Sequence, residues 1–346
     1  MNIIRHYFPG GNTPLGFVSF YGNILNSDTP GKLAVIKGGP GTGKSSLMKK
    51  IGEYFKSENE YVHYLHCSSD CESLDGVYLP KYNAAVIDGT APHIVDARYP
   101  GAYDKVFDVG TLISDNITEN KEEIYSLNCD ISKRFSKCYE NLRVASSVYD
   151  IMKNVSLESS LKNEIDNFCY NISKRVIHER DSGKIRKMFL SGITPQGLVN
   201  YVDNIMGDKY IIKLECDVGD GAGEILKKLI SYCKNQNTDM DIYYCPLKPY
   251  EPEHIVFKNT HIALTVSNKF HNISQADEVV YFKDFVKNDY DNSDNKVIYE
   301  DYIQKALCDV KEAKKLHDKL ETYYISNVDF SKMDKLFEDI KAFLVS

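Results

Sequence analysis

The sequence predicts an α/β fold made of two parallel-sheet domains in tandem, each followed by a helical hairpin. Three observations indicate this fold. A glycine-rich loop stands between an apolar run and an amphipathic pattern, the second half repeats the pattern of that stretch, and both halves end in segments with helical periodicity. The chain has 346 residues, more than one core usually organises, so about two domains are expected from length alone.

Composition narrows the class of protein. Hydrophobic residues make up 42% and charged residues 26%, as in an ordinary globular chain, and no window approaches the roughly 18 apolar residues of a membrane span. The first residues, "MNIIRHYFPGGNTP", do not resemble a secretion signal, and the nine cysteines lack the dense spacing of a disulfide framework. We therefore expect a cytoplasmic protein with reduced thiols.

Charge argues against nucleic acid as a partner. The formal net charge is -7, whereas broad binding to a phosphate backbone needs a basic face. The most obvious basic cluster is Lys184, Arg186 and Lys187, which we interpret as a solvated linker between domains because runs of charge usually face solvent. Neither a membrane nor a nucleic acid is expected as a partner; an unknown protein partner or self-association stays open.

A glycine-rich loop follows the apolar run at residues 33–36 in "GKLAVIKGGPGTGKSSLMKKIGEYF". From Gly38 to Ser45 the loop fits the spacing G-x-x-x-x-G-K-[ST], with a strand pattern before it and a helix pattern after it. Glycines let the backbone curl so that successive N–H groups point at phosphate oxygens, and the helix N-terminus adds positive potential. The alternative is a glycine turn with an incidental lysine. We expect a nucleotide to be bound by Gly38, Gly39, Pro40, Gly41, Thr42, Gly43, Lys44, Ser45 and Ser46.

Catalytic and metal-binding residues are expected beside this loop. Lys44 would place its ammonium group against the β- and γ-phosphates, and the Ser45 hydroxyl would ligate Mg2+. Residues 84–87 form a short apolar run typical of a buried strand, and Asp88 follows at its C-terminal end. We predict Lys44 and Asp88 as catalytic residues, and Ser45 and Asp88 as the magnesium site. The alternative for Asp88 is a structural role in opening the Asp-Gly turn.

The segment "YVHYLHCSSDCESLDG" is predicted to be a strand that runs into a polar loop at residues 68–75. That loop would project from the same sheet edge as the glycine loop, where it could contact a substrate or the attacking water. A zinc site is an alternative that we do not favour, because the histidines lie inside the predicted strand and no second cysteine pair follows at finger spacing. Its ligands would be His63, His66, Cys67 and Cys71.

The second half repeats the first at an offset of 178 positions, which superimposes "IKGGPGTGKSSLMKKI" on "LECDVGDGAGEILKKL" without a gap. Gly41 and Gly43 persist as Gly219 and Gly221. The counterparts of Gly38, Lys44, Ser45 and Asp88 are instead Cys216, Ala222, Gly223 and Val266. We therefore predict an internal duplication with a single nucleotide site. The second loop is acidic, with Glu215, Asp217, Asp220 and Glu224. A metal site made by these acids is an alternative that lacks the ligand spacing of a calcium loop.

The repeat also bears on two residues with possible chemistry. His93 has its counterpart in His271, and Cys67 has its counterpart in Cys245. These side chains persist where the predicted nucleotide ligands do not. We interpret them as packing or hydrogen-bonding residues and do not favour His93 as a catalytic base.

Segments with helical periodicity stand at the end of each half of the sequence. Apolar residues recur at three- and four-residue steps over 124–152 and 161–176, and again over 303–323 and 333–343. We interpret each pair of segments as an antiparallel hairpin whose apolar stripes form a core, in preference to a surface for a partner. The predicted boundaries are 1–110 for the first sheet domain, 111–185 for its hairpin, 186–290 for the degenerate second domain and 291–346 for the C-terminal hairpin.

These motifs resemble those of P-loop NTPases, and more closely those of the tandem P-loop ATPases of Gram-positive, spore-forming bacteria. The resemblance is carried by "GGPGTGKSSLMKKIG", "HCSSDCESLDG" and "VIDGTAPHIVD" in the first half and "FLSGITPQGLVNYVDN" at the start of the second. It implies ATP or GTP with Mg2+ at the glycine loop. Many P-loop ATPases place glutamate after the strand-end aspartate, but Gly89 stands there in this chain.

The missing glutamate leaves the residue that would activate water open. Hydrolysis would be slow, or its base would come from Asp70, Glu72, Asp75 or Asp96. Arg98 is a candidate for stabilising charge on the transferred phosphate, with a surface salt bridge as its alternative role.

Three functions are compatible with this sequence. The first is an ATP-binding protein and Mg2+-dependent ATPase in which nucleotide state controls the contact between the halves or with a partner. The second is a P-loop kinase for a small molecule, which the small number of arginines, seven against 35 lysines, does not favour. The third is a nucleotide-gated scaffold that does not hydrolyse its nucleotide.

Overall fold

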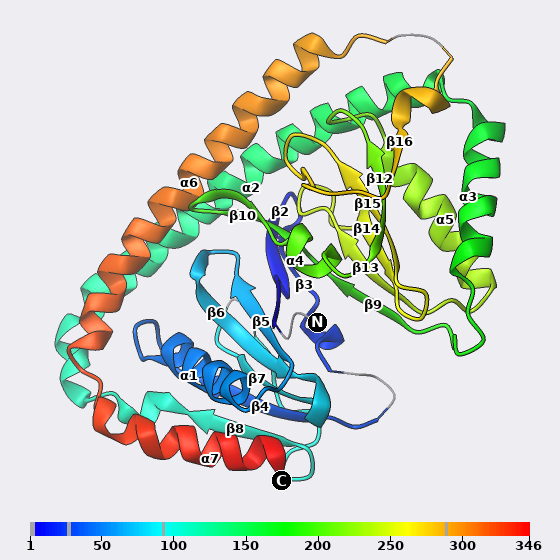
Figure 1. Ribbon diagram of the computed structural model, residues 1–346. Coiled ribbons are helices and arrows are strands. Elements are labelled where there is room, and N and C mark those ends of the chain that lie inside the picture. The colour runs from blue at the N-terminus through cyan, green and yellow to red at the C-terminus, as the bar shows by residue number, and fades with distance from the viewer. Residues whose placement is uncertain (1–3, 26–28, 92–93, 288–289) are drawn as a thin grey trace.

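The computed structural model describes residues 4–25, 29–91, 94–287 and 290–346. These residues form two halves, each built on a six-stranded sheet and each with a small two-stranded ribbon (Figure 1). The α/β class and the two-domain layout predicted from the sequence are confirmed.

The first sheet has the strand order β1-β5-β6-β7-β4-β8. β6 runs antiparallel to both of its neighbours, and the other pairs are parallel. Residues 70–75, expected in a polar loop, instead begin β6, so that prediction is wrong. The strands are β1 (Ile4–Tyr7), β4 (Lys32–Lys37), β5 (Val62–Cys67), β6 (Asp70–Leu79), β7 (Ala84–Asp88) and β8 (Asp104–Asp108), with the ribbon β2 (Gly10–Thr13) and β3 (Gly16–Ser19).

The second sheet has the order β9-β13-β14-β15-β12-β16, which is the order of the first sheet when the strands of each half are taken in chain order. Its antiparallel strand is β14, the counterpart of β6. The strands are β9 (Ile185–Met188), β12 (Tyr210–Glu215), β13 (Met240–Tyr244), β14 (Pro252–Phe257), β15 (Ile262–Ser267) and β16 (Glu278–Tyr281), with the ribbon β10 (Ser191–Thr194) and β11 (Gly197–Asn200).

One amphipathic helix follows the glycine loop of each half. α1 (Lys44–Ser57) buries Leu47, Met48 and Ile51, and α5 (Ala222–Asn235) buries Leu226 and Leu229 in the same way. The spacing of these residues puts them on one helix face, which packs on the sheet. The remaining helices are α2 (Lys121–Glu158), α3 (Lys162–Val176), α4 (Val202–Met206), α6 (Ser293–Ile325) and α7 (Met333–Val345).

The terminal helices of each half do not form the predicted hairpins. α2 runs antiparallel to α6 along most of its length, while α3 turns away from α2 and packs on α5 (Figure 1). α7 likewise leaves α6 and packs on α1 and β4 of the first half. The helices lie close to their predicted ranges, but their partners differ because an apolar stripe indicates burial without specifying what covers it.

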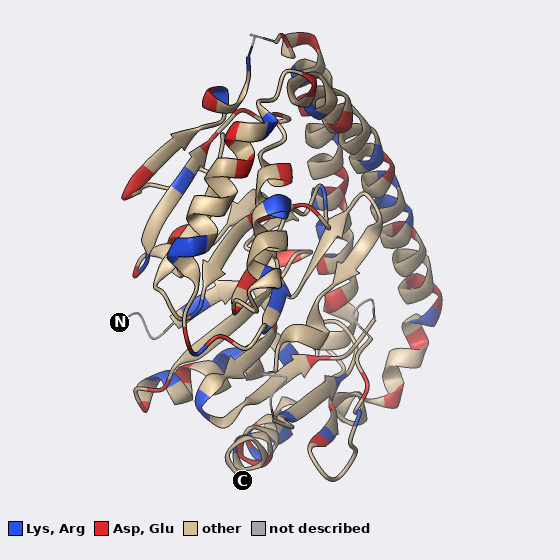
Figure 2. Ribbon diagram, turned by 90° about the vertical axis from the view of Figure 1, so that its right-hand side faces the viewer, with Lys and Arg blue, Asp and Glu red and all other residues tan. Residues whose placement is uncertain are grey.

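The last helix of each half therefore packs in the core of the other half. Phe337, Ile340 and Leu344 of α7 belong to the core around α1, and Ile165 and Ile172 of α3 belong to the core around α5. On the outer surface of the molecule, acidic and basic residues are interspersed along the two long helices (Figure 2). The two halves are thus joined by exchanged helical arms.

Backbone hydrogen bonds fix both arms in the same way. Ser114 N–H donates to the Asn327 carbonyl at 2.7 Å, and Asp329 N–H donates to the Leu112 carbonyl at 2.9 Å. The counterpart pair joins Lys287 to Ser159 at 2.8 Å and Leu161 to Phe285 at 2.7 Å. In each case the segment after the last strand of one half meets the turn before the last helix of the other half.

The two halves also meet directly through β1 and β9. Phe8 and Phe189 exchange backbone hydrogen bonds of 3.0 and 3.2 Å, and both side chains are fully buried in a core shared by the two halves. Arg186 lies at this contact, where its guanidinium binds Asp241 (Nη2 to Oδ2, 2.6 Å) and covers the Tyr7 ring. The interpretation of this basic cluster as a solvated linker is therefore wrong for Arg186.

Among the described residues, none of the helices has the length and apolar character that crossing a membrane requires.

Candidate functional site

The glycine loop of the first half connects the C-terminal end of β4 to the first residue of α1. Gly41 and Gly43 have positive φ angles of 65° and 84°, which a glycine adopts without strain. The Thr42 hydroxyl donates to the Gly39 carbonyl at 2.8 Å and is buried, so the loop is held closed by its own side chain. This local geometry is the one that the glycine spacing predicts.

Lys44 and Asp88 come together at this loop, as expected. β7 pairs with β4 in parallel, with Asp88 opposite Ile36, and this register brings the end of β7 beside the loop. Lys44 Nζ lies 3.5 Å from Asp88 Oδ2 and donates to the carbonyls of Gly38 (3.0 Å) and Gly39 (2.6 Å). The lysine ammonium is thus already directed along the inner side of the loop.

Ser45 and Ser46 occupy the first turn of α1 in different settings. The Ser45 hydroxyl accepts a hydrogen bond from Leu74 N–H at 3.0 Å, which links the helix start to β6. Ser46 is exposed, and Pro40 is half-buried in the loop. Ser45 is therefore placed beside Lys44 and β6, whereas Ser46 faces solvent.

Thr90 is a site residue that sequence reasoning missed. Its hydroxyl donates to the Gly38 carbonyl at 3.0 Å, and Gly38 N–H lies 3.3 Å from the same oxygen. Thr90 N–H donates to Asp88 Oδ1 at 2.8 Å. One threonine therefore connects the first glycine of the loop to the aspartate at the end of β7. The Asp-Gly-Thr sequence was the available signal, because such turns often bond back to the aspartate.

The four acidic residues considered as the base that activates water have different surroundings. Asp70 Oδ2 binds Lys314 of α6 at 3.2 Å and accepts from the Ser73 hydroxyl, and Asp96 binds Lys37 at 3.0 Å. Glu72 is exposed, and Asp75 is buried. Arg98 has its guanidinium beside Gly22. His93 lies outside the described residues.

The C-terminal helices of the chain cover the first glycine loop. A Cβ atom at Gly39 would collide with the Tyr324 ring, and one at Gly41 would lie 2.8 Å from the Glu321 carbonyl. Gly43 lies next to Phe330 in the same way. The loop glycines thus serve a second purpose, since they allow the end of α6 and the turn before α7 to approach the backbone closely.

The zinc interpretation of the β5 segment is wrong. The His63 ring is 2.9 Å from the Tyr7 hydroxyl, whereas the His66 ring is held between the His6 ring (2.8 Å) and the Cys71 carbonyl (2.9 Å). Burial lowers the pKa of His66 to about 4. These side chains have separate partners, and in the described part of the chain they form no convergent set of metal donors.

The second glycine loop is filled by protein groups. A Cβ atom at Gly219 would lie 2.6 Å from Met152 Cβ, and one at Gly223 would collide with the Glu251 side chain. Gly223 is the counterpart of Ser45, so Glu251 occupies the space that a serine would need. α2 therefore covers this loop as α6 covers the first.

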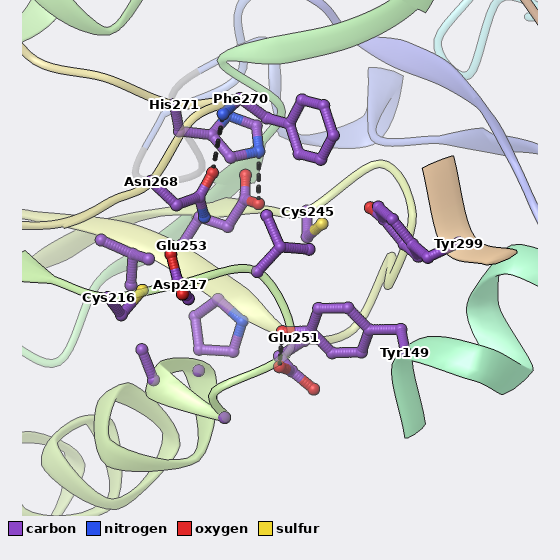
Figure 3. Close-up of a pocket in the computed structure, with 16 residues that line it drawn as sticks. Tyr149, Cys216, Asp217, Cys245, Glu251, Glu253, Asn268, Phe270, His271 and Tyr299 are labelled. Atoms are coloured by element: carbon purple, nitrogen blue, oxygen red, sulfur yellow. Dashed lines mark hydrogen bonds and ion pairs between the residues drawn. The ribbon is translucent and has the colours of Figure 1, made fainter. Parts of the chain in front are cut away.

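Lys153 of α2 supplies a positive charge to the second loop from outside it. Its Nζ lies 3.1 Å from Glu251 Oε2 and 3.2 Å from Glu224 Oε1, and Tyr149 donates its hydroxyl to Glu251 Oε1 at 3.0 Å (Figure 3 shows Tyr149 and Glu251). Burial alone would lower the pKa of Lys153, but the two carboxylates raise it. The amine is thus held as a cation by the protein's own acids.

The other acids of the second loop also have partners within the protein. Asp217 binds Lys296 of α6 at 2.6 Å, Glu215 binds Lys213 at 2.8 Å, and Asp220 accepts from the backbone N–H of Asp217. A calcium-type site formed by these acids is not what the structure shows, because each carboxylate is directed to a different protein partner.

No protein-family model, curated protein or solved structure matches the chain.

Proposed function

We propose that the protein binds a nucleoside triphosphate, ATP in the first place, at the loop from Gly38 to Ser46, and that it is a slow Mg2+-dependent ATPase of the P-loop class. The observation that carries this proposal is the convergence of Lys44 and Asp88, 3.5 Å apart, beside a glycine loop at the N-terminal end of a 14-residue helix. Backbone N–H groups, a lysine and a strand-end acid are the groups that hold a triphosphate and its metal ion.

The donors fit a magnesium ion and its nucleotide. The hydroxyl of Ser45 and the carboxylate of Asp88 are the oxygen ligands that Mg2+ prefers, and the ion would neutralise the charge that develops on the phosphates. Lys44 would exchange its bonds to the Gly38 and Gly39 carbonyls for phosphate oxygens. Slow turnover is expected because Gly89 follows Asp88 and because Asp70 and Asp96 are already bound by lysines.

We further propose that the two halves arose by duplication of one P-loop unit and that the second unit has lost its nucleotide. The identical strand order of the two sheets supports a common origin. The loss is supported by Glu251 in the space of the missing serine and by Lys153 bound to Glu224 and Glu251. One nucleotide per chain follows from this arrangement.

Nucleotide state would control the exchanged arm. Tyr324 and Glu321 of α6 contact the same glycines that would hold phosphate. A triphosphate that reshapes the loop would therefore change the packing of α6 against it. This coupling also favours the nucleotide-gated scaffold as a second candidate, in which binding moves the arm without turnover. A small-molecule kinase gains no comparable support: Arg98 lies beside Gly22 and Arg186 is bound to Asp241.

The test is binding of a fluorescent ATP analogue with Mg2+ to the wild type and to Lys44→Ala. We expect Lys44→Ala to weaken binding at least about tenfold, because a charge-assisted contact contributes on the order of 1.5–3 kcal/mol. Lys56→Ala is the matched control, since Lys56 lies on the same helix but binds Glu53 at the surface. Equal affinity of the wild type and Lys44→Ala would refute the site.

Phosphate release then separates the two candidates. Steady release from ATP by the wild type, lost in Lys44→Ala and kept in Lys56→Ala, supports the ATPase. Tight binding without release supports the scaffold instead. Running the assay with GTP in parallel determines the base preference.

A further inference from the structure

Three metal-binding side chains converge in the second half, away from the first glycine loop. Cys245 follows β13, Glu253 lies in β14, and His271 lies in the segment after β15 (Figure 3). Each offers one donor atom, and the three donor atoms lie within 4.8 Å of one another. Within the described part of the chain, this is the one group of three or more cysteine, histidine and acidic side chains that converge in this way.

We propose that Cys245, Glu253 and His271 bind one divalent transition-metal ion, with Zn2+ as the preferred ion. A thiolate, an imidazole and a carboxylate are the ligand types of zinc, and three protein ligands leave the fourth tetrahedral position to a water molecule. Tetrahedral zinc places its ligand atoms roughly 3.3–3.8 Å apart, so the widest separation would shrink by about 1 Å, and ligation would replace the 2.8 Å contact between His271 Nε2 and Glu253 Oε1. This site is independent of the nucleotide proposed for the first half.

The three proposed ligands are buried, and the cavity beside them has room for a fourth ligand. The three residues are between 6% and 9% exposed, so each ligand is held by the surrounding core. They line a cavity of about 30 Å3 together with Tyr149, Tyr299 and other residues. A water molecule needs at least about 10–15 Å3 of such space. The cavity can therefore hold a metal-bound water.

The charges of the group suit a dication. Glu253 Oε1 lies 2.8 Å from His271 Nε2, so a carboxylate and an imidazole already face each other in this group. Coordination would release the thiol proton to solvent and requires a neutral His271 whose ligating nitrogen carries no proton, so that the thiolate and carboxylate together balance the two charges of the ion.

Hydrogen bonding alone leaves this group incompletely satisfied. His271 Nδ1 is buried and has no hydrogen-bond partner among the described residues, and the same is true of Nε2 of the neighbouring His254. Buried polar atoms are nearly always paired with protein, water or an ion. A nearby ion and its water would supply partners that the protein side chains do not.

The first half keeps part of the group at its matching positions. Cys67 and Asp75 are the counterparts of Cys245 and Glu253, and the Asp75 charge and hydrogen bond contribute to raising the pKa of Cys67, after burial itself. The counterpart of His271 is His93, which lies outside the described residues. The proposal is therefore limited to the second half.

Cobalt spectroscopy of the full-length, nucleotide-free protein tests the site. After metal removal with a chelator, Co2+ should give a sulfur-to-cobalt charge-transfer band and the intense visible bands of tetrahedral cobalt, and Zn2+ should abolish both by displacement. Cys245→Ser should lose the charge-transfer band. His271→Gln should weaken Zn2+ binding by more than about 100-fold, beyond the 10–100-fold cost of losing an outer partner of a metal ligand.

Two controls keep the test independent of folding and of the nucleotide. Cys216→Ser removes a thiol that lines the same cavity but is not one of the three donors, and it should keep the full spectrum. Lys44→Ala should also keep it. Circular dichroism of the metal-free proteins shows which variants fold; if Cys245→Ser does not, His271→Gln and Glu253→Gln carry the comparison. A wild type without a cobalt spectrum, or an unchanged band in Cys245→Ser, would overturn the proposal.

Discussion

Replacing Lys153 by methionine should make the protein easier to unfold by about 2–3 kcal/mol. The Lys153 side chain is 14% exposed and binds Glu251, whose side chain is 5% exposed. Removing one partner of a buried ion pair costs about 3–5 kcal/mol, because the remaining charge is left without compensation. A cost at or below the bottom of this range is expected because Lys227 stays within 3.6 Å of Glu251 and 2.7 Å of Glu224.

Lys227→Met is the matched control for this prediction. Lys227 touches the same two carboxylates, but its side chain is 41% exposed, so its loss should cost less than about 1 kcal/mol. Urea denaturation at neutral pH, followed by circular dichroism, measures both changes. The double variant Lys153→Met/Glu251→Gln should recover part of the loss. The reasoning fails if Lys153→Met is as stable as the wild type or if the two lysine variants lose equal stability.

Two further predictions concern other contacts. The double variant Ala222→Lys/Gly223→Ser should not create a second nucleotide site, because Glu251 fills the space that the new serine would need. Equilibrium dialysis should still give one bound nucleotide per chain, and two bound nucleotides would contradict this account of the loop. The Asp241 carboxylate should stabilise the fold at pH values above about 3.8, its pKa in the unfolded chain. Burial alone would raise the folded pKa, but the neighbouring Arg186 outweighs burial and lowers it. The stabilisation should therefore be lost as pH falls through this lower folded pKa. Arg186→Met should flatten this pH dependence, measured as the urea midpoint between pH 6 and pH 3; an unchanged slope would exclude the ion pair as its source.

Local signals predicted the first loop and its surroundings well. The apolar run before Gly38 and the amphipathic pattern after Lys44 correspond to β4 and α1, and Asp88 ends β7 as expected. These features depend on residues close together in the chain and on the tendency of parallel strands to present their carboxyl ends at one edge. Thr90 was missed because a threonine in a turn has many common roles, and only the fold shows that it reaches Gly38.

Non-local features were beyond the sequence patterns. The first residues of β6, 70–73, are only partly buried and can therefore be polar. Their sequence lacks the apolar pattern of a buried strand and so resembled a loop. Arg186 resembled a surface charge because its partner, Asp241, lies 55 residues away. The donor group at Cys245 was missed because its three members lie on separate segments that only the fold of the sheet brings together.

The exchange of helical arms has a consequence for how the chain is divided. A fragment ending near residue 185 would contain the first glycine loop but not α7, which supplies Phe337 and Ile340 to its core. Such a half could complete its core by exchanging helices with a second copy. If the two halves arose by the duplication proposed above, the single unit would have been a dimer with exchanged helices, and fusing two copies would have turned a concentration-dependent assembly into one that a single chain completes by itself.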